Sequence, residues 1–351
     1  PTRETFTGLR RNSEAVCRAA ELMAEVRSPA ILIGNGVSRH DAIDEVVKLA
    51  ELTGARVYQQ WMADMDFPTS HPQYIEDINA FPGPDIKDII KSIDLLLIIG
   101  TKMFRAAPFA SSKPLPLELK VVHIDDNPWE IGKNFRVDIG IEGDIKACVA
   151  DLCDALEKEM TTETRSVVSD RVKEISVQKK EMKKSFLEIA LKERNKVPIS
   201  VSRLMTDLRE SLSPGTIIVE ECWSCGSPMR KYIDFDEPKS FFRMRGGGSI
   251  GWGIPAALGV KLALPERPVI AVVGDGGAIF SIQGLWIAAR YKLPVIFVIC
   301  SNRSYGTLKM VKMITMGEQA NRRNLGLDLD KPRLDFVQLA QSMGVMGRRV
   351  K

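Results

Sequence analysis

The segment Val269-Ile-Ala-Val-Val-Gly-Asp-Gly-Gly277 predicts the fold of the second half of this chain, because an apolar run passes directly into a glycine turn. Five consecutive apolar residues indicate a buried parallel strand, and the pattern beyond the turn predicts a helix from about Ser281 to Tyr291. Backbone N–H groups and the helix dipole favour an anion at such a turn, and glycines let the backbone approach it closely. The segment therefore predicts a phosphate site.

A carboxylate lies inside this turn, and it would repel a phosphate unless a cation lay between them. Asp275 is that carboxylate, and Asn302 follows the next apolar run, Val295–Cys300. Ligands of open α/β sheets bind beyond the carboxyl ends of the strands, so the two side chains are expected side by side. Mg²⁺ takes oxygen ligands, typically carboxylates together with phosphates. Gly-Asp-Gly alone is a common turn, but together with Asn302 and the Ser304 carbonyl it predicts a magnesium site.

Short apolar runs alternate with helical patterns in the first 155 residues. This alternation predicts a parallel sheet covered by helices on both faces. The expected strands are 30–33, 56–58, 95–99 and 121–124, and the expected helices include 41–52 and 84–92.

A charged stretch separates this first block from a second one. Residues 155–195 are dense in Lys, Glu and Arg, and the interleaved acids favour a solvated helix over a nucleic-acid surface. The second block has expected strands at 216–220, 240–244, 269–273 and 295–300, a helix at 334–343 and a β-like run from Val345. We therefore predict an α/β chain with two doubly wound parallel-sheet domains. The predicted parts are a Rossmann-like domain over 1–155, a helical linker over 156–196 and a second domain over 197–351, truncated at its C-terminus.

Composition narrows the class of protein. The chain has 351 residues, of which 44% are hydrophobic and 27% charged, with a formal net charge of +4. This balance is too weak to indicate nucleic acid or a membrane surface as a partner. No apolar run approaches the roughly 18 residues of a membrane span, and the polar start does not match a signal peptide. Six cysteines in a chain of this length form no dense disulfide framework, which predicts a cytoplasmic protein.

Two longer stretches resemble a known superfamily. Residues 246–260, Gly-Gly-Gly-Ser-Ile-Gly-Trp-Gly-Ile-Pro-Ala-Ala-Leu-Gly-Val, and residues 264–276, which end in the Gly-Asp-Gly turn, are similar to thiamine diphosphate-dependent 2-oxo acid decarboxylases and carboligases. Among these, the benzoylformate decarboxylases are the most similar. The resemblance continues through 285–291 and 294–299, and in the first block through 67–72 and 100–105.

The resemblance implies thiamine diphosphate and Mg²⁺ as cofactors. It makes Asp275 and Asn302 side-chain ligands of the metal and Ser304 a backbone ligand. Gly248 would offer its carbonyl to the aminopyrimidine of the cofactor, and Ile250 would hold the cofactor in its bent form, with core packing as the alternative role. The residues implied around the diphosphate are Ser224, Gly276, Gly277 and Tyr305.

The function implied by the resemblance is non-oxidative decarboxylation of a 2-oxo acid, in which the cofactor accepts the electrons as CO₂ leaves. One alternative is a carboligase of the acetolactate synthase type. An alternative of another class is a cofactor-binding fragment or subunit without activity of its own. The resemblance also implies a homodimer or homotetramer.

The superfamily uses three domains, and this chain resembles only the central and the diphosphate-binding ones. The glutamate that activates the cofactor belongs to the N-terminal domain, so no catalytic residue is assigned here and we expect the chain to be an incomplete part of the enzyme.

One departure from the family pattern concerns the substrate. A histidine that follows Phe-Arg in benzoylformate decarboxylase is replaced by Ala106-Ala-Pro108, which puts the same substrate or proton relay in doubt.

Three further features carry competing interpretations. Cys222-Trp-Ser-Cys225 has the spacing of a redox or zinc motif, but the resemblance places this loop at the diphosphate. Gly34-Asn-Gly36 follows a strand and lacks the third glycine of the dinucleotide fingerprint, so a structural role is favoured over a nucleotide site. His71 lies in a Pro-rich segment, where a structural turn is favoured over catalysis.

Overall fold

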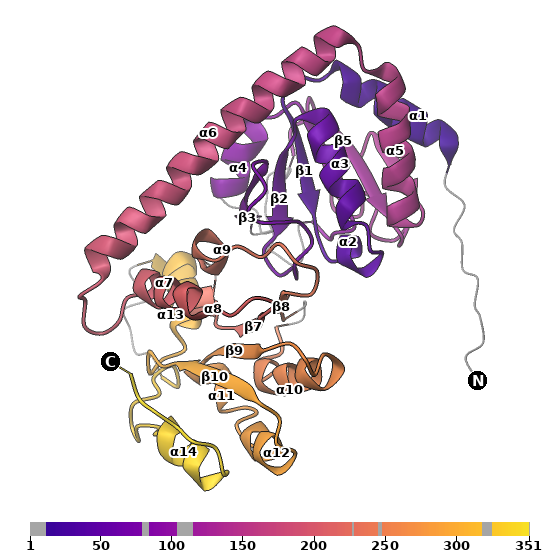
Figure 1. Cartoon of the computed structure of the whole chain (residues 1–351). Coiled ribbons are helices and arrows are strands. Elements are labelled where there is room, and N and C mark those ends of the chain that lie inside the picture. Colours follow the sequence, from indigo (N-terminus) through magenta and orange to yellow (C-terminus); the bar gives the residue numbers. More distant parts are fainter. Residues whose placement is uncertain are drawn as a thin grey trace, which may run out of the picture. The chain divides into compact units, whose positions relative to one another are not determined.

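The computed structural model describes residues 12–78, 84–103, 115–226, 228–244, 248–317 and 325–350 (Figure 1). The chain divides into two compact units, Pro1–Lys184 and Ser185–Lys351. Each unit has its own parallel sheet, and the two are described separately below. The predicted fold class, two doubly wound parallel-sheet domains, is confirmed.

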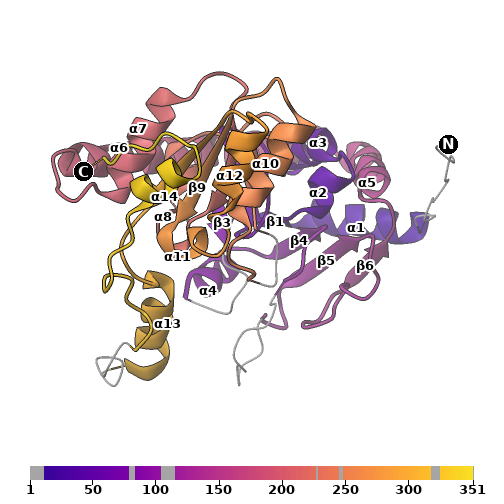
Figure 2. The same ribbon diagram turned by 90° about the horizontal axis from the view of Figure 1, so that it is seen from below.

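The first unit is built on a six-stranded parallel sheet in the order β3-β2-β1-β4-β5-β6. Figure 2 shows β1, β4, β5 and β6 following one another across it. The strands are β1 (Pro29–Ile33), β2 (Arg56–Gln60), β3 (Tyr74–Ile78), β4 (Leu95–Ile99), β5 (Lys120–Asp125) and β6 (Ile139–Glu142). The four expected strands are present. We did not predict β3 and β6, whose sequences YIEDI and IGIE mix polar and apolar residues at the edges of the sheet.

Both faces of this sheet are covered, because alternate residues of its strands enter two different cores. Ile31, Leu97 and Ile124 pack on one side with α1 (Ser13–Glu25), α3 (Ile43–Thr53) and α5 (Ile145–Glu159). Leu32 and Leu96 belong to the core on the other side, with α4 (Pro84–Lys91). A single-turn helix, α2 (Gly36–Arg39), follows β1.

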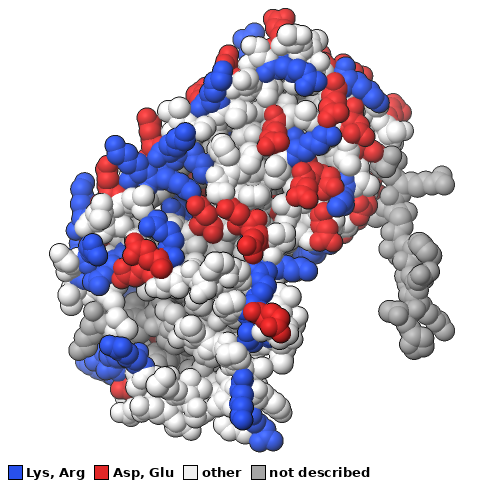
Figure 3. All heavy atoms as spheres, viewed as in Figure 1, with Lys and Arg blue, Asp and Glu red and all other residues white. Residues whose placement is uncertain are grey.

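The charged stretch after α5 forms one helix, α6 (Thr162–Glu193), as predicted (Figure 1). Acidic and basic side chains are interspersed on the face seen in Figure 3. In the first unit this helix is tied to backbone carbonyls at helix ends: the Arg171 guanidinium donates to Thr53 O at the end of α3 and to Val26 O just after α1, both at 2.8 Å. The Lys179 ammonium donates to Thr69 O at 2.6 Å. Its charged residues therefore include specific docking contacts.

The second unit contains a four-stranded parallel sheet in the order β10-β9-β7-β8. Its strands are β7 (Ile217–Glu221), β8 (Phe241–Arg243), β9 (Val269–Gly274) and β10 (Val295–Cys300). Its helices are α7 (Val201–Ser211), α8 (Trp223–Gly226), α9 (Met229–Tyr232), α10 (Gly253–Ala263), α11 (Asp275–Ala278), α12 (Gly284–Arg290), α13 (Gly306–Met316) and α14 (Phe336–Ser342). Alternate residues of β7 and β9 pack with Ile254 and Ala257 of α10 in the core.

Two expectations differ from the structure. The helix predicted from about Ser281 to Tyr291 is present as α12 but begins at Gly284, and a single-turn helix that was not predicted, α11, precedes it from Asp275. The strand predicted from Val345 is wrong. The chain turns back after α14 at Gly344, which has φ +79°, and Val345 N donates to Ala340 O at 2.9 Å, so this backbone closes the helix end instead of joining a sheet.

Among the described residues, no helix combines the length and the apolar composition needed to cross a lipid bilayer.

Candidate functional site

The carboxyl edge of the four-stranded sheet brings the two predicted loops together. Gly274 at the end of β9 is in register with Cys300 at the end of β10, so both chains leave the sheet at the same level. Asp275 is 3% exposed. Its Oδ2 accepts hydrogen bonds from Ser301 Oγ at 3.1 Å and Arg303 N at 2.6 Å, and its Oδ1 accepts from Gly276 N at 2.9 Å. One buried carboxylate thus joins the loops that follow neighbouring strands.

The predicted partners of Asp275 lie on the second of these loops. Asn302 Oδ1 accepts a hydrogen bond from Ser304 N at 3.0 Å, and Asn302 Nδ2 donates to Ser224 Oγ at 3.4 Å. The Ser224 hydroxyl is therefore next to Asn302, although the two residues are far apart in sequence. An amide oxygen has two lone pairs, so Asn302 can keep its bond to Ser304 and still bind a cation. Carboxylate, amide and carbonyl oxygens are the donors that Mg²⁺ prefers, and the site fits that ion.

Two glycines of the turn are fixed by close neighbours. A Cβ added to Gly276 would lie 2.6 Å from Cε1 of Tyr305, so the tyrosine ring packs directly on the bare backbone. A Cβ on Gly277 would lie 3.1 Å from Oε1 of Glu221. The backbone of the turn therefore carries no side chain at these two positions, and the Tyr305 ring packs against it at Gly276.

Sequence reasoning missed Glu221, the last residue of β7. It is 3% exposed, and its carboxylate accepts hydrogen bonds from Gly251 N and Gly253 N, each at 2.5 Å. Burial raises the pKa of Glu221, although these backbone N–H groups oppose the shift. The signal in the sequence was the pair Glu220-Glu221 directly after the buried run Ile217–Val219. Glu221 holds the loop that precedes α10.

Gly248 and Ile250 lie on this same loop. Gly248 has φ +68°, a conformation that glycine adopts readily and other residues rarely do. The Ile250 side chain is 40% exposed, so packing in the core of its own unit does not account for it. The adjoining residues Gly246 and Gly247 lie outside the described residues.

The Cys222-Trp-Ser-Cys225 motif forms a disulfide, with Cα atoms 5.5 Å apart. The bond encloses Ser224, the hydroxyl partner of Asn302. Cys300 has a free thiol, and burial raises its pKa to about 12.

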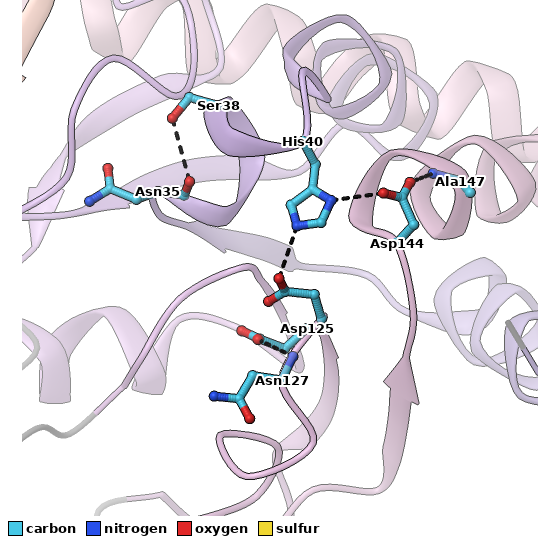
Figure 4. A network of polar contacts seen from close by, with 8 residues as sticks. Asn35, Ser38, His40, Asp125, Asn127, Asp144 and Ala147 are labelled. Carbon is cyan, nitrogen blue, oxygen red and sulfur yellow. Dashed lines mark hydrogen bonds and ion pairs between the residues drawn. The ribbon is translucent and has the colours of Figure 1, made fainter. Parts of the chain in front are cut away.

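The first unit contains a separate polar network around His40 (Figure 4). His40 Nδ1 lies 2.8 Å from Asp144 Oδ2, and His40 Nε2 lies 3.1 Å from Asp126 Oδ2. Burial alone would lower the pKa of His40, but the bonds to the two aspartates outweigh it and raise the pKa. Next to them, burial raises the pKa of Asp125 to about 7, even though Asn127 N donates to its carboxylate.

The glycines after β1 have a packing explanation. Gly36 N donates to Gly100 O at 2.8 Å, and a Cβ on Gly36 would lie 2.4 Å from the Gly100 Cα. A Cβ on Gly34 would lie 2.6 Å from the Thr101 Cβ. The loops after β1 and β4 approach each other so closely that side chains are excluded. Residues 104–108, where the sequence departs from benzoylformate decarboxylases, lie outside the described residues.

With this geometry in place, comparisons with known proteins identify the family. Residues 16–152 match the central domain of thiamine pyrophosphate enzymes, and residues 224–351 match their C-terminal TPP binding domain. The chain belongs to the thiamine pyrophosphate enzyme family, as its resemblance predicted.

Relatives within this family have different activities. The chain is 32% identical over 339 residues to a probable acetolactate synthase large subunit of Methanocaldococcus jannaschii, covering 95% of this chain and 55% of the relative. It is 27% identical over 348 residues to a sulfoacetaldehyde acetyltransferase of Alcaligenes xylosoxydans xylosoxydans, covering 94% of this chain and 57% of the relative. The chain thus spans little more than half the length of these relatives.

Solved structures show the same fold. Benzoylformate decarboxylase from Polynucleobacter necessarius superposes with a TM-score of 0.79 at 23% identity, covering 98% of this chain and 60% of that one. A thiamine diphosphate-dependent 4-hydroxybenzoylformate decarboxylase from Rhodococcus jostii RHA1 gives 0.77 at 24% identity, covering 100% and 61%.

Proposed function

We propose that this chain binds the diphosphate end of thiamine diphosphate through Mg²⁺ and serves in the decarboxylation of a 2-oxo acid. The observation that carries the proposal is the buried Asp275 carboxylate, which accepts bonds from Ser301 Oγ and Arg303 N where two neighbouring parallel strands end. The proposed organisation is a central domain over 1–155, a helical linker over 156–196 and a diphosphate-binding domain over 197–351.

Each predicted residue has a proposed role. Asp275 and Asn302 hold the metal by their side chains and Ser304 by its carbonyl. Gly248 and Ile250 contact the ring portion of the cofactor. The residues proposed to surround the diphosphate are Ser224, Gly276, Gly277 and Tyr305.

The chain's own chemistry is binding and positioning. Asp275 supplies the negative charge that balances the cation, and Glu221 fixes the loop of Ile250 through the Gly251 and Gly253 N–H groups. When bound, thiamine diphosphate would accept the electron pair that remains on the substrate carbon when CO₂ leaves.

Two reactions are compatible with this site. The first is the non-oxidative decarboxylation of a 2-oxo acid, as in benzoylformate decarboxylases, with which the chain shares its fold. The second is a carboligation of the acetolactate synthase type, which the names of several sequence relatives favour. We further propose a homodimer or homotetramer that acts in the cytoplasm.

Cofactor binding tests the proposal directly. Titrating the chain with thiamine diphosphate and Mg²⁺ by calorimetry should show binding that requires the metal. Asp275→Asn removes a ligand charge and should weaken the metal-dependent binding by about 100-fold or more, since even an outer-shell change costs roughly 10- to 100-fold. Asp330→Asn, at an exposed aspartate of the same unit, is the matched control and should bind like the unsubstituted chain. Equal binding by Asp275→Asn and the control would refute the site.

Product analysis separates the reactions. A panel of 2-oxo acids should be assayed on the protein encoded by the whole reading frame and on this chain alone. Aldehyde release supports the decarboxylase, and a 2-hydroxy ketone supports the carboligase. Cofactor binding without either product by the whole protein supports a binding role. We expect this chain alone to bind the cofactor without turnover, because the activating glutamate of the family belongs to a domain that this chain does not match.

A further inference from the structure

Three cysteine sulfur atoms meet at the carboxyl edge of the four-stranded sheet. The Sγ atoms of Cys222, Cys225 and Cys300 all lie within 4.8 Å of one another. Cys222 directly precedes α8, Cys225 lies within that single turn, and Cys300 is the last residue of β10. Among the described residues, this is the group of His, Cys, Asp and Glu side chains that has the spacing of a metal site.

The register of the sheet explains why these sulfur atoms converge. Cys300 is paired with Gly274 across β10 and β9, and Glu221 is paired with Val273 across β7 and β9. Cys222 follows Glu221 and is therefore level with Gly274 as well. A Cβ on Gly274 would lie 3.8 Å from Cys222 Sγ. Because β9 ends in Gly274, no side chain of β9 separates the sulfur atom of Cys300 on one side from that of Cys222 on the other.

The spacing is compatible with a single ion. Zn–S bonds are about 2.3 Å, which places the sulfur atoms of a tetrahedral site roughly 3.8 Å apart. Starting from separations of at most 4.8 Å, small side-chain rotations are enough. Sulfur ligands select soft or borderline cations, whereas the oxygen atoms of Asp275 and Asn302 suit Mg²⁺. The two sites therefore differ in ligand chemistry.

We propose that Cys222, Cys225 and Cys300 bind one thiophilic divalent cation of the Zn²⁺ class once the disulfide is reduced. A dithiol reductant transfers two electrons to the Cys222–Cys225 bond and becomes a disulfide itself, which leaves two thiols on the protein. The cation then replaces the protons of the three thiols, and these pass to solvent. The fourth position of a tetrahedral ion remains open to water. The disulfide and the bound ion are mutually exclusive states of the same residues.

Cobalt titration tests this site without reference to activity. The chain is reduced with a phosphine that does not bind metals strongly, and Co²⁺ is added. We expect one equivalent of Co²⁺, a sulfur-to-cobalt charge-transfer band, displacement by Zn²⁺ and no displacement by excess Mg²⁺. Cys300→Ser should weaken binding by about tenfold or more. Cys17→Ser, at an exposed cysteine of the first unit, is the matched control and should leave binding unchanged.

Several results would overturn the proposal. They are absence of the charge-transfer band in the reduced chain, an unchanged affinity in Cys300→Ser, and displacement of Co²⁺ by Mg²⁺. If circular dichroism shows that Cys300→Ser does not fold, Cys225→Ser on the α8 turn replaces it with the same expectation. Zn²⁺ should also protect all three cysteines from alkylation, as read by mass spectrometry, and protection of only Cys222 and Cys225 would contradict the three-sulfur site.

Discussion

At the scale of single residues, two buried carboxylates organise the edge of the second sheet in different ways. Asp275 joins the loops that follow β9 and β10 through Ser301 Oγ and Arg303 N. Glu221 holds the loop before α10 through two backbone N–H groups. The first lies in a recognisable motif and the second does not, so only Asp275 could be predicted.

Gly276 gives a test of packing at the proposed diphosphate site. In Gly276→Ala the new Cβ would meet the Tyr305 ring at 2.6 Å, and the ring must move. We expect a loss of about 1–3 kcal/mol in the free energy of unfolding, as for other overpacked sites, together with weaker cofactor binding. Chemical denaturation and calorimetric titration measure the two effects.

The matched control for Gly276→Ala is Gly259→Ala in α10. A Cβ at Gly259 meets nothing within 4 Å, so this change should leave cofactor binding intact and stabilise the helix by up to about 1 kcal/mol. Equal behaviour of the two variants would contradict the packing argument.

His40 gives a pH-dependent prediction. Its folded pKa is raised above 6.5, so its contribution is fully present below pH 6.5 and is lost as the pH rises through the folded pKa. The pKa of Asp144 is lowered: burial opposes the shift, but bonds from Ala147 N and His40 outweigh it. The Asp144 contribution is therefore present above pH 3.8 and is lost as the pH falls through its folded pKa.

The expected result for His40→Gln follows from the pH range in which His40 and Asp144 are both charged. Both aspartates are partly exposed, so screening limits the loss of stability to about 0.5–1 kcal/mol. The loss should be largest between pH 3.8 and 6.5 and should fade at alkaline pH. Urea unfolding across this pH range measures it, and a loss that does not vary with pH would argue against the charged pair.

At the scale of elements, α6 shows how a helix rich in charge can still be specifically docked. Its residue Ile175 is fully buried, and Arg171 and Lys179 donate to backbone carbonyls of the first unit. Composition predicted the helix correctly, because Lys, Glu and Arg are good helix formers. Composition could not say which charged side chains make such bonds, since that depends on segments more than 100 residues away in sequence.

Lys179 tests this docking. Its side chain is 8% exposed and donates to the carbonyls of Thr69 and His71. Lys179→Ala removes hydrogen bonds from a charged donor. Each such bond contributes at most about 1.5–3 kcal/mol, so the free energy of unfolding should fall measurably. The adjacent Lys180→Ala, at an exposed position, should change stability by less than about 0.5 kcal/mol. Similar effects of the two substitutions, measured by denaturant unfolding, would show that Lys179 has no special role.

At the scale of the whole chain, each unit has a core of its own. Among the described residues, the cores of the first unit lie on the two faces of its six-stranded sheet, and a core of the second lies on β7, β9 and α10. A ligand that binds one folded unit stabilises that unit by mass action, by about 2.7 kcal/mol when its concentration is 100 times its Kd. The proposed cofactor contacts all lie in the second unit.

Scanning calorimetry should therefore show two transitions. Thiamine diphosphate with Mg²⁺ should raise the midpoint of one of them, and Asp275→Asn should abolish that shift while leaving the other transition in place. A shift of both transitions by the cofactor would contradict a site confined to the second unit.

The sequence by itself determined the parallel strands with long apolar runs, the charged helix and the two loops that carry Asp275 and Asn302. These features are local, because an apolar run, a glycine turn and a residue at a strand end are each encoded within a few neighbouring positions. The edge strands β3 and β6 escaped prediction, since their mixed composition becomes strand only beside a partner. The strand expected from Val345 failed because the chain closes the end of α14 instead.

Only the tertiary structure decided which distant residues meet. The backbone contacts of Glu221, the bond between Asn302 and Ser224, and the approach of Cys300 to Cys222 all depend on the strand order β10-β9-β7. That order is set by the packing of whole strands and helices, and no spacing along the chain specifies it. The position of Gly274 between two cysteine-bearing strands becomes meaningful only once the strands are in register.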